Sequence, residues 1–192
     1  MLDTSDARNT QAVQAIDPSL GKSAFWTQHT IKSGTFSVVR WYEFDLGPAT
    51  PVVLHSGTAG VTNAFAFNGA VSPDRAFVAN GVGTFGNRFV IEFNSSSQFD
   101  DPGIWAASGV NGNLDSFLLV VAGVAPYTDQ SSCPNPGDTC RWGDYSAAFP
   151  DPRPNVFTSL SGVVWGTNQW GQVRNSISLG NEWRTRIFAL EP

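Results

Sequence analysis

The sequence has few lysines, few charges of either sign and no long apolar run. Lys22 and Lys32 are its two lysines, and charged residues make up 14% of the 192 positions, well below the roughly 25% of ordinary soluble domains. The basic residues are scattered and the net charge is −5, so the clustered positive surface that neutralises phosphates is missing. We expect no nucleic-acid partner. The longest apolar run, residues 117–125, is too short to cross a bilayer, and we expect no membrane segment.

Turn-forming residues and aromatic rings are abundant instead. The chain holds 19 glycines and 12 prolines, and aromatic residues make up 12% of it. This composition excludes a coiled coil or helical bundle, which needs far more Ala, Glu, Lys and Leu. A hydrophobic content of 41% is enough to bury a core, which excludes a disordered chain. The sequence therefore predicts a compact all-β protein.

Two cysteines, Cys133 and Cys140, flank a segment rich in Pro, Asn, Gly and Asp. Such a segment turns and brings the two side chains together, so we expect a local disulfide and an oxidising compartment. Two free thiols in a cytosolic loop are the alternative. His29 and His55 are too far away in sequence to complete a metal site, and we expect neither a metal nor a cofactor. No signal peptide follows Met1, so we expect a secreted or extracellular protein whose signal sequence is absent from this chain, or a fragment.

A repeat runs along the chain. Three segments align without gaps, each a short apolar strand that ends in an aspartate turn: residues 13–18, 70–75 and 147–152. A second apolar run follows each of them, at residues 24–26, 76–79 and 163–165. A third run alternates with period two at residues 36–44, 88–93 and 184–190, and a fourth follows in the first two units, at residues 51–55 and 103–107.

Four short antiparallel strands every 45 to 50 residues are typical of a β-propeller blade. We expect a partial propeller over residues 1–192: blade 1 at about 6–58, blade 2 at about 61–109, an insertion at about 110–140 and blade 3 at about 141–192. Because three blades do not close a ring, we expect an open arc that the remaining blades of a larger protein or a second copy complete. The start of the chain is a candidate for the missing fourth strand of blade 3. A β-sandwich with coincidental spacing is the alternative.

Several of these segments also resemble a known group of proteins. Residues 141–146, 150–152, 164–168 and 183–187 resemble the last blade of large secreted bacterial β-propeller proteins, which are loosely sialidase-like. Residues 6–8, 25–30 and 40–42 resemble an earlier blade of the same proteins. The group has no single activity, so the resemblance implies the fold more than a function. Its members have six or more blades, whereas three are found here.

Sialidase chemistry needs three arginines to hold a carboxylate, a tyrosine nucleophile activated by a glutamate, and an aspartic acid. Tyr145 is a candidate nucleophile, and the candidate cations are Arg8, Arg141 and either Arg184 or Arg186. The glutamates argue against this chemistry. Glu43, Glu92 and Glu191 lie on predicted third strands, away from a central channel, which leaves Glu182. The turn Ser-x-Asp-x-Gly-x-x-Trp of many sialidase blades is also absent.

The block around Tyr145 is the best candidate for a ligand site. In a propeller the innermost strands line the channel, which places five residues at its rim: Arg8, Asn68, Arg141, Asp144 and Tyr145. A carbohydrate or protein ligand is one interpretation of these polar groups, and satisfaction by channel waters is the other. We also expect Asp144 to bind backbone or water. The repeated aspartates Asp17, Asp74 and Asp151 are better explained as turn formers than as catalysts.

Together these features predict a non-catalytic β-propeller module of a secreted protein that binds carbohydrate or protein or supports a neighbouring domain. The alternative is a fragment of a sialidase-like glycoside hydrolase whose other catalytic residues lie on missing blades.

Overall fold

A computed structural model describes residues 2–4, 7–17, 21–77, 83–128, 133, 135, 137–152, 162–173 and 182–192. These residues form strands, turns and loops and no helix, which confirms an all-β protein. No helix in this part of the chain is therefore long and apolar enough to span a membrane. Some predicted features fall outside the described residues, namely Asp6 at the start of blade 1 and residues 78–79 of the second apolar run.

The first sheet is an antiparallel meander in which each strand pairs with the next along the chain. Its four strands are β2 (Ala12–Asp17), β3 (Lys22–Ser33), β4 (Phe36–Asp45) and β5 (Val52–Ala59). On β4 every second residue from Val39 to Asp45 is buried, as the period-two pattern predicts. All four predicted apolar runs of this unit become strands.

The second sheet has the order β10-β8-β7-β6, with β9 attached to β8. The strands are β6 (Phe65–Phe77), β7 (Gly83–Ser96), β8 (Gly103–Val110), β9 (Asn113–Leu114) and β10 (Leu118–Val121). Asn111 and Gly112, with φ of 49° and 80°, join β8 to β9 in a two-residue turn. Asn-Gly suits such a turn because both central residues need positive φ.

The third sheet has the order β12-β13-β14 and consists of β12 (Ala147–Pro150), β13 (Val164–Gln172) and β14 (Glu182–Leu190). A separate parallel pair joins β1 (Leu2–Asp3) to β11 (Cys140–Arg141). The expectation that the start of the chain supplies a fourth strand to the third sheet is therefore wrong. Trp142 donates its backbone N–H to the carbonyl of Asp3 at 2.9 Å, which extends the contact of β1 with this segment.

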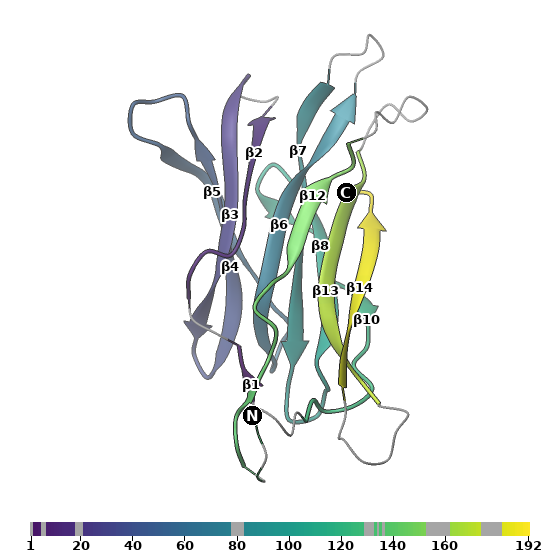
Figure 1. The fold of residues 1–192 in the computed structure, drawn as a ribbon. Coiled ribbons are helices and arrows are strands. Elements are labelled where there is room, and N and C mark those ends of the chain that lie inside the picture. Colours follow the sequence, from purple (N-terminus) through teal and green to yellow (C-terminus); the bar gives the residue numbers. More distant parts are fainter. Residues whose placement is uncertain are drawn as a thin grey trace.

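The three sheets stand side by side as layers, with the second sheet between the other two (Figure 1). The first and second sheets enclose the main core, in which Trp26 and Trp41 pack on Phe89 with ring centroids 5.1 and 4.7 Å apart. The second and third sheets meet through a smaller apolar cluster that includes Val90 and Val164. The described residues form a stack of antiparallel sheets and do not close into a ring.

Two details of the predicted second unit need correction. The two strands expected at residues 70–75 and from residue 76 onward are one strand as far as the structure describes them, because β6 runs from Phe65 through Phe77 with a register shift between Pro73 and Arg75. Asp74 is completely buried within this strand instead of forming a turn, and it accepts a hydrogen bond from the backbone N–H of Gly162 at 3.2 Å. The long-range bond replaces the local one that a turn would provide.

The predicted insertion also contributes to the sheet. Residues 118–121 form β10, which pairs with β8 and becomes the fourth strand of the second sheet. An open arc of blades is also expected to leave apolar side chains such as Phe89 and Trp183 in contact with water. For Phe89 this expectation is wrong, because Phe89 is fully buried against the first sheet. Trp183 is 45% exposed on β14.

Candidate functional site

Three of the five predicted rim residues, Arg8, Asn68 and Asp144, line one small cavity, together with Gln28 and Thr30 of β3 and Gly69 of β6. Its volume is about 20 Å³, which fits one water molecule and is far below the roughly 300 Å³ of small ligand sites. Thr4 lines this cavity and also a much larger cleft beside it. The predicted residues thus converge, but on a space suited to water, as in the alternative interpretation.

Asn68 links the second sheet to the third beside this cavity. Its φ is 48°, a conformation that asparagine tolerates better than most residues. Its Nδ2 donates to Oδ1 of Asn168 at 3.1 Å, and Nδ2 of Asn168 donates to the carbonyl of Asn68 at 2.9 Å. This reciprocal pair joins β6 to β13. Asn68 is buried, so it acts here as a structural residue and not as an exposed rim group.

The other two predicted residues lie outside the cavity. Arg141, at the end of β11, forms an ion pair and hydrogen bond with Asp144 in the loop that follows. That hydrogen bond, together with the charge of Asp144, raises the pKa of Arg141. Asp144 therefore binds a guanidinium through its Oδ2, a partner that the expectation of backbone or water did not include. Tyr145 is 79% exposed.

The remaining candidates for a carboxylate clamp, Arg184 and Arg186, lie on the exposed strand β14. Arg184 forms an ion pair with Glu182 at 3.0 Å. Neither arginine lines the cavity beside Asn68. The structure thus separates these cations from Arg8.

Glu92 lies in the centre of the stack, on the second strand of its sheet and not on a third strand. It is fully buried, and its Oε2 accepts a hydrogen bond from Nδ2 of Asn168 at 2.7 Å. Burial raises the pKa of the Glu92 carboxyl well above its ordinary value, and the hydrogen bond from Asn168 opposes this by less. A carboxyl with a raised pKa is a candidate acid in principle. Here it lies between two sheets, where no substrate reaches it.

Glu43 on β4 is also buried, and its Oε2 lies 2.8 Å from Nδ1 of His55 on the next strand. Glu191 is exposed after the end of β14. Within the described residues, no three His, Cys, Asp or Glu side chains are grouped so that they could hold a metal ion.

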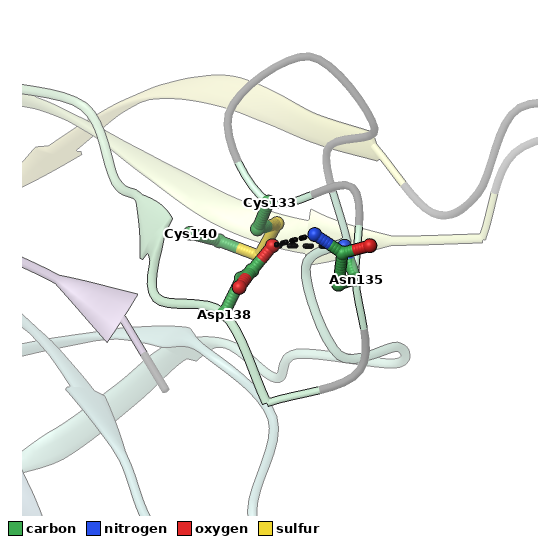
Figure 2. Close-up of a disulfide and its surroundings, with 4 residues drawn as sticks. All are labelled: Cys133, Asn135, Asp138 and Cys140. Atoms are coloured by element: carbon green, nitrogen blue, oxygen red, sulfur yellow. Dashed lines mark hydrogen bonds between the residues drawn. A yellow bond between two sulfur atoms is a disulfide. The ribbon is translucent and has the colours of Figure 1, made fainter.

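The predicted disulfide between Cys133 and Cys140 is confirmed, with Cα atoms 4.9 Å apart. Figure 2 shows the bridge beside Asp138, whose Oδ2 accepts hydrogen bonds from the backbone N–H of Asn135 at 2.8 Å and from its side-chain amide at 3.1 Å. The bridge precedes Trp142, whose ring N–H donates to Oδ1 of Asn94 at 2.9 Å. The hydrogen bond of Trp142 fastens the segment after the bridge to β7. A disulfide is compatible with an extracellular protein.

A cleft with a volume of about 630 Å³ lies where β6 begins and β7 ends, at the end of the molecule that carries the N-terminus (Figure 1). Phe65, Phe67 and Tyr127 line part of its wall, and Asp100 and Asp101 come from the loop after β7. Phe65 is 44% exposed and also lines a second hollow of about 340 Å³ beside Lys32 and Phe36. It therefore stands between two adjoining hollows.

The loop after β7 has a fixed shape. Ser97 Oγ donates to Oδ2 of Asp100 at 2.9 Å and accepts from the backbone N–H groups of Phe99 and Asp100 at 3.0 Å. This turn leaves Phe99 85% exposed. Sequence reasoning missed the cleft. The run of serines and aspartates at residues 95–101 was the available signal, but it marks any polar loop equally well.

Comparison with known proteins adds no assignment: no protein-family model, no curated protein and no solved structure matches this chain. The resemblance to sialidase-like propellers stays a prediction.

Proposed function

We propose that this chain is a non-catalytic binding module built on part of a β-propeller, and that it binds a carbohydrate in the cleft beside Phe65. The observation that carries the proposal is the cleft itself. Its volume of about 630 Å³ lies within the roughly 300–1,000 Å³ of typical ligand sites. It is much larger than the cavity of about 20 Å³ beside Asn68.

The stack of sheets supports the propeller part of the proposal. The first two sheets are four-stranded meanders, apart from the short β9, and the third is a meander of three strands. Their first strands β2, β6 and β12 begin close together: Gln11, just before β2, bonds through its side-chain amide to both the N–H and the carbonyl of Ala148 on β12. Ser146 Oγ donates to the carbonyl of Gly69 on β6 at 2.8 Å. Converging inner strands are the arrangement expected of blades around an axis.

The lining of the cleft favours a sugar among small ligands. Sugars present apolar C–H faces that pack on aromatic rings and hydroxyl groups that donate to carboxylates. Phe65 supplies an exposed ring, and Asp101 on the same cleft supplies an acceptor. Hydroxyls of Ser37 and Ser96 line the wall as well. The acidic lip disfavours an anionic sugar, and we infer a neutral one.

The carboxyl groups support binding over hydrolysis. A glycosidase needs two of them on either side of the scissile bond, one with a raised pKa to act as the acid. Glu92 has the raised pKa but is sealed between the second and third sheets. Asp100 and Asp101 are consecutive residues on one lip of the cleft. We place the module outside the cell, since its disulfide needs an oxidising compartment.

The experiment is a binding screen against neutral oligosaccharides, followed by titration calorimetry of the best ligand. Phe65→Ala and Asp101→Asn should each weaken binding by about tenfold or more. Phe149→Ala is the matched control, because Phe149 is 48% exposed on the third sheet, away from the cleft. Affinity that survives Phe65→Ala contradicts the proposed site. Turnover of an aryl glycoside, aryl sialosides included, that is lost on Tyr145→Phe contradicts the non-catalytic function.

A further inference from the structure

The stack ends in two sheet faces that expose apolar side chains. On the outer face of the first sheet, the rings of Phe25, Tyr42 and Phe44 form a row with centroids 5.7 and 5.8 Å apart. Val53 pairs with Phe44 across the sheet, shares its face and is 51% exposed. A sheet that faces water permanently usually carries polar residues on that side.

The outer face of the third sheet has the same character. Phe149 pairs with Trp165 and shares its face, and Thr167 pairs with Ile187 one step along the strands. Phe149 is 48% and Ile187 70% exposed. Within the described part of this face, the paired positions from Trp165 to Gln169 carry no charged side chain.

The register of the repeat tells which way corresponding positions of the three sheets face. When the three repeated aspartates are superposed, Trp26 on β3 and Glu92 on β7 occupy corresponding positions. Trp26 faces the second sheet, where it packs on Phe89, and Glu92 faces the third sheet, where it binds Asn168. In both cases the position points toward the next sheet of the stack.

Thr167 holds the corresponding position on β13, because it pairs with Ala147 as Glu92 pairs with Ala70. In the third sheet, however, this position lies on the outer face with Ile187. The stack therefore has a direction. It ends in a face built to receive a following sheet and begins in a face built to follow a preceding one.

We propose that a second copy of this chain covers both faces, so that the third sheet of each copy packs on the first sheet of the other. This inference rests on the blade arrangement proposed above and not on the ligand. Two such head-to-tail contacts are related by a two-fold axis and close the assembly. Three sheets from each copy give about six blades, within the roughly four to eight of natural propellers.

The chemistry of the faces favours this occupant. Arg40 is the charged residue of β4 on the outer face of the first sheet, and its guanidinium already lies 5.5 Å from the Tyr42 ring centroid and bonds to Ser56. A nearly uncharged face meets a nearly uncharged face. This matches sheet-on-sheet packing of the kind found between the first and second sheets and disfavours a highly charged partner.

The test is the molar mass in solution, from light scattering and sedimentation, across a range of protein concentrations. The wild-type chain should have twice its 20.6 kDa mass. Ile187→Glu on the third sheet and Val53→Glu on the first should each raise the dimer dissociation constant by at least tenfold. Leu118→Glu is the control, because Leu118 is 55% exposed on the edge strand β10 of the middle sheet. Circular dichroism checks that each variant folds.

Mixing the two variants tests the head-to-tail geometry. A mixed dimer of Ile187→Glu and Val53→Glu has both changes in one interface and leaves the other interface intact. The mixture should therefore dimerise more tightly than either variant alone. A monomeric wild type, a filament, or a Val53→Glu variant that dimerises normally would overturn the proposal. A monomer that still binds a neutral sugar would overturn it and leave the proposed function standing.

Discussion

The interface between the first and second sheets is made of aromatic rings, whereas the interface between the second and third contains a carboxyl group and several amides. Trp26, Trp41 and Phe89 fill the first, all of them almost completely buried. Glu92, Asn68 and Asn168 occupy the centre of the second, linked by hydrogen bonds of 2.7 to 3.1 Å. Each interface buries one face of the second sheet, yet the two are stabilised by different forces.

The difference matters because apolar packing and buried hydrogen bonds respond to different changes. Burial of apolar surface is non-directional and roughly proportional to area. A buried amide network adds little net stability when it is complete but is costly when one partner is lost. The first interface should therefore dominate the free energy of unfolding, and the second should fix how the third sheet is placed and should depend on pH.

The largest expected effect breaks the aromatic interface. Phe89→Ala removes a fully buried ring that contacts both Trp26 and Trp41, and should lower the free energy of unfolding by about 3–5 kcal/mol. Phe99→Ala makes the same chemical change at a site 85% exposed, and should stay within about 0.5 kcal/mol of wild type. Urea unfolding followed by tryptophan fluorescence measures both. Equal losses in the two variants would show that this interface is not the main core.

The second-largest expected effect is a dependence of stability on pH, which comes from the interface between the second and third sheets. The raised pKa of Glu92 means that the folded protein keeps a proton that the unfolded chain releases above about pH 4.3. Stability should therefore fall as pH rises from there through the folded-state pKa, with a slope of up to about 1.4 kcal/mol per pH unit. Glu92→Gln keeps the shape and removes the proton equilibrium, so the slope should flatten.

Unfolding free energies at pH 5 and pH 8 give this slope for wild type and variant. Glu191→Gln, at an exposed position after β14, is the control and should leave the slope unchanged. If Glu92→Gln does not alter the wild-type slope of unfolding free energy against pH, then Glu92 is ionised in the folded protein. The stability of the polar interface would then not depend on pH.

A smaller effect concerns the loop that closes the polar interface from one end. The bridge Cys133–Cys140 precedes Trp142, which donates a hydrogen bond to Asn94 between the sheets. For a loop this short, loss of the bridge should cost about 2 kcal/mol. Replacing both cysteines by serine, or adding reductant, tests this by urea unfolding. Intact-mass analysis that finds two alkylatable thiols without reductant would contradict the bridge itself.

Local patterns in the sequence predicted the strands better than their grouping. The alternation of Phe89, Ile91 and Phe93 correctly marks one buried face of β7. Pro73 and Asp74 look like a turn, but in the structure they form a register shift inside β6, with Asp74 bonded to Gly162. A bond between residues 88 positions apart gives no signal in the local sequence. The sequence pattern therefore predicts two strands and a turn where the structure has the single strand β6.

The candidate site shows the same limit. The repeat brought Arg8, Asn68 and Asp144 together as equivalent positions, and they do line one cavity. The large cleft needed the fold, because its wall combines β1, the starts of β4 and β6, the loop after β7 and residues 126–127. No motif joins these segments. The segments have in common that they lie at the same end of the stack of sheets.

The smallest expected effect concerns an exposed ion pair near the polar interface between the second and third sheets. Arg141, at the end of β11, forms an ion pair with Asp144 beside the small cavity, and the arginine side chain is 67% exposed. Exposed pairs of this kind contribute little, since the side chains lose entropy and salt screens the charges. Arg141→Gln should therefore leave the unfolding midpoint unchanged within error, and a slight loss at low salt should vanish at high salt. A shift as large as that of the disulfide variant, independent of salt, would show that Arg141 supports the polar interface directly.

Asn68→Ala is the contrasting variant, because it removes the bonds to Asn168 and places alanine at a φ of 48°. It should lower the free energy of unfolding by about 1–3 kcal/mol at any salt concentration.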